Sequence, residues 1–187
     1  MRDESEDDEG IAPTGSLAPR SLPLAPRHRI MGLDPGLHAT GYGVIDATDG
    51  DPKLVEAGVL RIPDSGSLST RLGILFESVA ELLEELKPTV VAVEELFSHY
   101  ARPRTAVIMG HARGVLLLAA ARKMIPTASY MPTKVKRNLT GHGRASKEQM
   151  QAAIQMHFSL DKPPEPPDVA DALAIALCHF HQARATK

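Results

Sequence analysis

The first half of the chain alternates between apolar and polar positions in short runs separated by turn signals. Residues 28–34 (HRIMGLD) form an apolar run that ends at Pro35-Gly36, and residues 40–47 (TGYGVIDA) alternate. A third run, residues 54–62, follows the turn signal at residues 49–52 (DGDP). Short runs bounded by such turn residues are typical of β-strands. We therefore expect three antiparallel strands in a meander.

After residue 62 the apolar positions change to helical spacing. Between residues 68 and 86, apolar residues recur at three- and four-residue intervals, which predicts a helix ended by Lys87-Pro88. Residues 89–93 (TVVAV) are almost entirely apolar, as in a strand buried on both faces. The other expected elements are a helix at 105–124 with Thr105 as N-cap, a strand at 127–131, and helices at 132–139, 146–158 (with a Ser146–Gln149 capping box) and 168–182.

This order of elements predicts an α/β domain built on a mixed five-stranded sheet, three antiparallel strands and then two parallel ones, with helices on both faces. Residues 1–29 are acidic and then proline-rich without apolar periodicity, so we expect an unpacked tail before one domain at 30–187. A single cysteine excludes a disulfide framework. The chain has no apolar run of membrane-spanning length and no signal-peptide pattern, so the expectation is a cytoplasmic protein without membrane spans.

Charge is segregated along the chain although its sum is nearly neutral, at a formal net charge of −2. Residues 30–95 contain twelve acids and four bases, whereas residues 96–147 contain ten bases and no acid. An acid-free basic segment is the electrostatic pattern of a protein that binds a polyanion. A fold that mixes the two segments into a balanced surface is the alternative, and the charge pattern alone leaves both open.

Four carboxylates occur where an α/β sheet builds its sites. Asp34 ends the first strand, Glu94 ends the buried fourth strand, and Asp168 and Asp171 share one face of the last helix. A turn residue, a solvated strand end and a favourable helix N-terminus are the respective structural alternatives. If the four meet, their repulsion requires a cation, and oxygen-only ligands suit Mg²⁺. Beside a basic segment, this set indicates phosphodiester hydrolysis with two metal ions about 4 Å apart.

Taken together, these residues resemble the RuvC family of Holliday-junction resolvases. The matching motifs, in order, are GLDPG at 32–36, TGYGV at 40–44, VAVEELF at 91–97, HARG at 111–114, VKRNLTGHGRASKEQM at 135–150 and DVADALAIA at 168–176. The resemblance implies a ribonuclease H-like fold and paired symmetric nicks in opposing strands of a four-way junction during recombination and repair. It also implies products with 5′-phosphate ends and dependence on Mg²⁺, which Mn²⁺ can replace.

The resemblance carries the family's catalytic, metal-binding carboxylates over to Asp34, Glu94, Asp168 and Asp171. Neighbouring side chains on a strand point to opposite faces, so only one of Glu94 and Glu95 enters the site, and the resemblance selects Glu94. Phe97 matches an aromatic that stacks on junction bases, and Lys136 and Lys147 match basic residues near the scissile phosphates. Further candidate phosphate contacts are Arg102, Arg104, Arg137 and Arg144.

The resemblance also implies two protein partners. One is a second copy of the chain, because a homodimer matches the two-fold symmetry of the junction. The helix at 105–124 favours this role, since it is more apolar than one buried face requires and contains Gly110 and Gly114. A helix covered on all sides within the monomer is the alternative. The other implied partner is a branch-migration motor of the RuvA–RuvB type.

Three other functions share parts of this pattern. Residues 32–44 also resemble the phosphate-binding hairpin of actin-like ATPases and sugar kinases, but those enzymes need a second lobe that 158 residues cannot supply. A junction-binding module without cleavage has no use for four acids. A ribonuclease H-like nuclease acting on RNA–DNA hybrids is the third, and the HARG segment and basic Gly-x-Gly stretch favour the resolvase over it.

Overall fold

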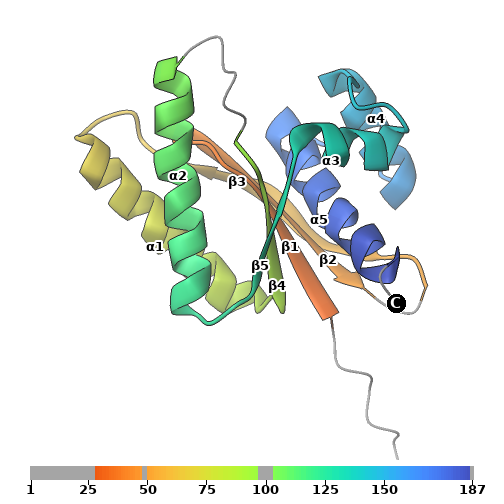
Figure 1. Ribbon diagram of the computed structural model, residues 1–187, viewed down its shortest axis with the longest axis horizontal. Helices are drawn as coiled ribbons and strands as arrows, with labels where there is room; N and C mark the ends of the chain where they lie inside the picture. The colour runs from red at the N-terminus through yellow and green to blue at the C-terminus, as the bar shows by residue number, and fades with distance from the viewer. Residues whose placement is uncertain (1–27, 48–49, 97–102, 186–187) are drawn as a thin grey trace, which may run out of the picture.

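A mixed β-sheet is the frame of the domain (Figure 1). The computed structural model describes residues 28–47, 50–96 and 103–185. Within these residues the strand order is β3-β2-β1-β4-β5; β1–β2 and β2–β3 pair antiparallel, and β1–β4 and β4–β5 pair parallel. The expected five-stranded mixed sheet is thereby confirmed. The strands are β1 (His28–Asp34), β2 (Ala39–Ala47), β3 (Lys53–Arg61), β4 (Val90–Glu94) and β5 (Thr127–Tyr130).

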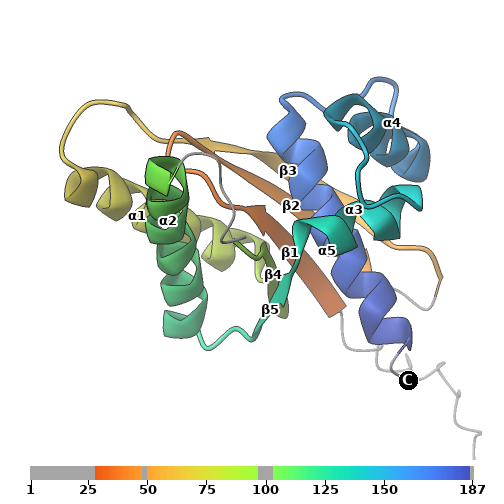
Figure 2. The ribbon, with the colours of Figure 1, turned by 45° about the horizontal axis from the view of Figure 1, so that its top comes forward.

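Helices cover both faces of the sheet (Figure 1). One face carries α1 (Leu68–Leu86) and α2 (Pro103–Arg122). The opposite face carries α3 (Pro132–Thr140), α4 (Lys147–Phe158) and α5 (Pro167–Ala185), of which α5 lies directly across the strands (Figure 2). Among the described residues, no helix combines the length and apolar character that a membrane span requires.

Strand β4 is buried from both sides, as its continuous apolar run predicts. Val91 and Val93 belong to the apolar cluster under α1 and α2, whereas Val90 and Ala92 belong to the cluster under α5. Alternating side chains of one strand therefore serve two cores. Burial of this kind holds the end of β4, with Glu94, at a fixed place in the sheet.

The expected boundaries agree with the structure to within a few residues, with two informative differences. The prediction that Thr105 caps the second helix is wrong, because α2 begins at Pro103. Proline is favoured at a helix start, since it lacks the N–H that would go unpaired there. β1 begins at His28, and Arg29 Nε donates to Asp46 Oδ1 at 2.7 Å. Residues 28 and 29, assigned to the tail by composition, are thus part of the sheet, while residues 1–27 lie outside the described residues.

Glycines bring α5 into direct contact with the sheet. A Cβ built on Gly32 of β1 would lie 2.1 Å from the Ala172 carbonyl oxygen, and one built on Gly41 of β2 would lie 2.2 Å from the Asp168 carbonyl oxygen. No other residue type fits at either position. The close approach places the first turns of α5 beside the end of β1. The buried residues of α5 are Val169, Ala170, Ala172, Leu173, Ala174, Ile175, Ala176, Leu177, Cys178 and Phe180.

Candidate active site

Two parallel neighbouring strands bring the first two carboxylates together. Leu33 of β1 pairs in register with Val93 of β4, so Asp34 and Glu94 follow at the same edge of the sheet. Asp168 and Asp171 lie in the first turns of α5, which the contact between Gly41 and Asp168 seats against this edge. The four acids that the sequence singles out thus come from three elements and meet at one place.

The electrostatics of this place are those of a crowded acid cluster. Burial raises the pKa of Asp34 well above its usual value, and the negative charges of Glu94, Asp171 and Asp168 raise it further. Burial and then Asp171 raise the pKa of Glu94 to about 7. Burial also raises the pKa of Asp171, and Asp168 adds to that shift. The effect of Glu94 on the pKa of Asp34, and that of Asp171 on the pKa of Glu94, place Glu94 in the cluster.

Two lysines face the carboxylates from the neighbouring helices. Lys147 lowers the pKa of Asp34 and Asp171, and Lys136 lowers the pKa of Asp171 and Glu94. Lys147 is the first residue of α4, whose start is fixed by the expected capping box. In that box Ser146 N donates to Gln149 Oε1 at 2.8 Å and Gln149 N donates to Ser146 Oγ at 3.3 Å.

A cavity of about 420 Å³ opens beside the cluster. Its lining includes Asp34, Asp168 and Lys147, together with the turn between β1 and β2 and residues from the start of α2. The turn is held by buried Thr40, whose Oγ1 donates to the Gly36 carbonyl at 2.6 Å. The carboxylates therefore border an open space, one wall of which is a turn closed by this hydrogen bond.

The donor set fits a divalent cation in chemistry, although the side chains do not enclose an ion as they stand. Within the described parts of the chain, no three histidine, cysteine, aspartate or glutamate side chains are arranged to hold a metal. All four donors are carboxylates, which hard cations prefer. Two lysines balance only half of four ionised carboxylates. A divalent cation would offset the remaining charge.

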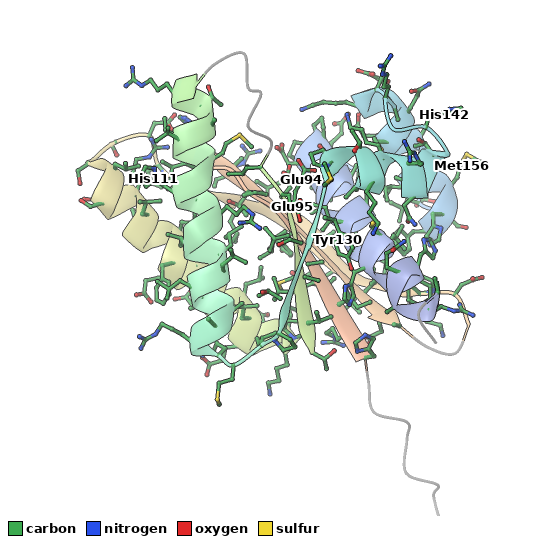
Figure 3. The ribbon with its side chains drawn as sticks, viewed as in Figure 1. Glu94, Glu95, His111, Tyr130, His142 and Met156 are labelled. Carbon is green, nitrogen blue, oxygen red and sulfur yellow. The ribbon has the colours of Figure 1, made fainter. Side chains whose placement is uncertain are left out.

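The arginine of the HARG motif has a role that sequence analysis did not assign. Arg113 Nε donates to the Glu94 carbonyl oxygen at 3.0 Å, and its Nη2 donates to Ser129 Oγ at 2.8 Å. The side chain thus ties α2 to the ends of β4 and β5, next to the acid cluster, where Glu94 projects between the helix layers (Figure 3). The HARG motif marks Arg113 in the sequence, but it does not reveal the partner of Arg113, which is a backbone atom 19 residues away.

The other expected DNA-binding residues either do not line the cavity beside the acid cluster or lie outside the described residues. Arg104 is exposed in the first turn of α2. Arg137 and Arg144 are exposed and border a second cavity of about 420 Å³, with His142 on the loop after α3 (Figure 3). Phe97 and Arg102 belong to residues 97–102, which the structure does not describe.

Comparison with known proteins decides the family. The profile of the family described as "Crossover junction endodeoxyribonuclease RuvC" matches residues 30–179. The chain belongs to the RuvC family. RuvC of Rhodopirellula baltica is 48% identical over 154 residues, which cover 82% of this chain and 86% of that protein. RuvC of Moorella thermoacetica is 43% identical over 150 residues, which cover 80% of this chain and 89% of that protein.

Solved RuvC structures share the fold. Thermus thermophilus RuvC superposes with a TM-score of 0.75 at 34% identity, over 84% of this chain and 96% of that chain. The same protein in complex with Holliday junction substrate superposes with a TM-score of 0.78 at 35% identity, over 85% of this chain and 96% of that chain. The ribonuclease H-like fold and the crossover junction endodeoxyribonuclease activity expected from the sequence are confirmed. RuvC enzymes are metal-dependent nucleases.

The acid cluster makes the stability of the metal-free protein depend on pH. Because the pKa values of Asp34, Glu94 and Asp171 are raised in the folded state, the folded protein binds more protons than the unfolded chain. The contribution of Glu94 is fully present below a pH of about 4.5 and is lost as the pH rises through about 7. Its shift corresponds to about 3 kcal/mol of unfolding free energy.

We therefore expect urea unfolding in EDTA to show a loss of stability between about pH 5 and pH 8, and Glu94→Gln should make this loss smaller, because Asp34 and Asp171 still contribute to it. Mg²⁺ added at the higher pH should raise the melting temperature of the wild type and raise that of Glu94→Gln less. If the free energy of unfolding depends on pH in the same way in the wild type and in Glu94→Gln, the pKa of Glu94 is not raised in the folded protein.

Proposed function

We propose that this RuvC-family chain resolves Holliday junctions by metal-assisted hydrolysis, with paired symmetric nicks, at the cluster of Asp34, Glu94, Asp168 and Asp171. The observation that carries the proposal is the convergence of these half-buried acids beside an open cavity, with two lysines facing them. A binding module has no need for a cluster of carboxylates in which the pKa values of Asp34, Glu94 and Asp171 are raised. A site for a metal-activated nucleophile does.

The carboxylates would hold two Mg²⁺ ions, and Mn²⁺ offers a similar preference for oxygen ligands. Bound there, the ions would supply Lewis-acid activation of a water and stabilisation of the leaving 3′ oxygen, which would give 5′-phosphate products without a covalent intermediate. Lys136 and Lys147 would offset the negative charge of the carboxylates and attract the phosphates of the strand to be cut. Arg113 keeps Glu94 in position by holding its carbonyl group.

The junction arms would continue over the surface of α3 and the loop that follows it. Arg137 and Arg144 border the second cavity, and no carboxylate is among the residues that line it. Such a surface attracts DNA phosphates. Gly141 has a φ of 79°, which lets the chain turn at the end of α3 and present His142 and Arg144 outward. Arg104, Arg102 and Phe97 complete the proposed DNA contacts at the start of α2 and in the segment before it.

We also propose a homodimer through α2. Val107 is 58% exposed and Leu118 is 54% exposed, and Gly114 has open space where a side chain would stand. These positions share one side of the helix with exposed His111. An apolar stripe of this kind, with a glycine for close approach, suits a second copy of the same helix.

A branch-migration motor of the RuvA–RuvB type is proposed as a further partner from the family resemblance.

A mobile four-way junction labelled in turn on each strand tests the proposed activity. With Mg²⁺ or Mn²⁺ we expect paired nicks at symmetric positions in two opposing strands, and products that DNA ligase can reseal. EDTA should prevent cutting, and a linear duplex of the same sequence should stay intact. Binding without cutting in either metal would leave only a junction-binding module. Preferential cutting of the RNA strand in an RNA–DNA hybrid would favour the alternative nuclease.

A further inference from the structure

A histidine that the proposed mechanism does not use lies at the mouth of the active-site cavity. His38 sits in the turn between β1 and β2 and lines the same cavity as Asp34, Asp168 and Lys147. Its side chain is 69% exposed. The exposed ring therefore borders the same open space as two of the carboxylates.

The ring is held in place by a chain of contacts from two other segments. His38 Nδ1 hydrogen-bonds to Asp64 Oδ1, in the loop between β3 and α1. Asp64 Oδ1 in turn accepts from Arg71 Nη2 of α1 at 3.1 Å. Arg71 Nη2 also donates to the Leu37 carbonyl oxygen at 3.1 Å, and it lies 3.4 Å from His38 Nδ1 itself. Residues far apart in sequence therefore converge on one exposed imidazole.

This arrangement is not the one that stability alone would favour. The Arg71 side chain is only 13% exposed, and its Nε is buried without a hydrogen-bond partner among the described residues. A buried, incompletely bonded guanidinium costs stability. Its only carboxylate partner within those residues is Asp64, which is 75% exposed. We infer that the contacts serve to orient His38.

The turn that carries His38 is rigid as well. Thr40 Oγ1 donates to the Gly36 carbonyl, and a Cβ built on Gly36 would lie 2.1 Å from the Ala39 carbonyl oxygen. With Nδ1 engaged by Asp64, the Nε2 edge of the ring has no hydrogen-bond partner among the described residues. The structure therefore presents one free ring nitrogen at a fixed position beside the cavity.

We propose that His38 is a DNA-contacting residue whose imidazolium donates Nδ1–H to Asp64 and Nε2–H to a phosphate oxygen of the strand entering the cavity. Asp64 and Arg71 are its positioning residues. The charged groups around it are Asp64, Arg71, Asp34, Lys147 and Asp168. Between the Asp64 carboxylate and a DNA phosphate, the charged form of the ring has an acceptor on each side. This inference rests on the proposed junction cleavage, because it assigns a contact to the same substrate.

Two substitutions at one position separate this contact from a structural role. His38→Asn keeps an amide nitrogen where Nδ1 meets Asp64 but has no atom in place of Nε2. His38→Arg restores a cation that reaches a phosphate. Lys53→Asn is the matched control, because it removes an exposed cation where β3 pairs with Asp46, at the opposite end of the strands from Asp34.

Junction affinity is measured by anisotropy of a labelled four-way junction in EDTA, over a series of salt concentrations. We expect His38→Asn to weaken binding about five- to tenfold and to reduce the slope of log Kd against log salt by about 0.7 to 0.9. His38→Arg should bind within about twofold of wild type, and Lys53→Asn should leave affinity and slope close to wild type.

Asp64→Asn tests the positioning role. It should weaken binding less than His38→Asn, and adding it to His38→Asn should cause little further loss, since both act on one contact. Wild-type affinity and salt slope in His38→Asn would overturn the proposal. So would a lowered melting temperature with unchanged DNA affinity, or equal weakening by His38→Asn and His38→Arg. Cutting by the wild type under Mg²⁺, assayed in parallel, tests the proposed function separately.

Discussion

Asp34→Asn is expected to bind a four-way junction and to leave it uncut. Asparagine keeps the shape of the side chain but replaces an anionic metal ligand with a neutral amide. Because Asp34 lies at the centre of the cluster, where all three other acids act on it, its loss should reduce the cleavage rate by a factor on the order of 10³ or more. Binding in EDTA should be retained or improved, since one negative charge facing the DNA is gone.

The measurement pairs single-turnover cleavage with junction binding, and Glu77→Gln serves as the control. Glu77 is an exposed acid on α1, and its substitution also removes one negative charge. Glu77→Gln should cut at the wild-type rate. Cutting at near wild-type rate by Asp34→Asn would remove Asp34 from the site. The melting temperature of Asp34→Asn in EDTA near neutral pH should exceed that of wild type, because a buried carboxylate that resists ionisation is no longer present.

Gly32→Ala is expected to cause the largest loss of stability of any single methyl added to the sheet. The new Cβ would stand 2.1 Å from the Ala172 carbonyl oxygen and 2.7 Å from the Ala176 backbone nitrogen. Both are backbone atoms of α5, so relief requires the helix itself to move. We expect the free energy of unfolding to fall by about 4 kcal/mol or more, which is an exceptionally large effect for a single substitution. Because α5 carries two of the four acids, cutting should fail with the fold.

Gly73→Ala is the matched control for this steric effect. Gly73 lies within α1, is exposed and has no heavy atom within 4 Å of an added Cβ. Alanine there should stabilise the protein by about 0.5 to 1 kcal/mol, because it favours the helix more than glycine does. Urea unfolding of both variants gives the comparison. Equal stability of Gly32→Ala and Gly73→Ala would show that α5 can move away from the sheet at little cost.

The parts of the fold that depend on neighbouring residues could be predicted from the sequence. The Ser146–Gln149 capping box spans three residues, and it forms as expected. The continuous apolar run of β4 predicts a central strand, and this strand does lie between β1 and β5. Thr105 shows the limit of such rules, because a suitable capping residue competed with Pro103, which starts the helix.

The parts of the site that depend on the path of the chain could not be predicted from the pattern alone. Asp34 and Glu94 meet only because β1 and β4 are neighbours, which the sequence pattern allows but does not require. The resemblance to the RuvC family, and not the pattern, predicted that Asp34 and Glu94 share one site. Arg113 reaches a backbone carbonyl, and His38 meets Asp64 across 26 positions. Contacts of this kind leave no periodic or compositional signal.

The position of α5 at the end of the element order has a consequence for how the protein is made. This helix supplies the partner layer for β1 and β2, which are the first strands to leave the ribosome. Their apolar face stays uncovered until more than a hundred further residues have been translated. Asp168 and Asp171 arrive with the same helix. A nascent chain therefore lacks half of the acid cluster until the apolar cluster under α5 can close.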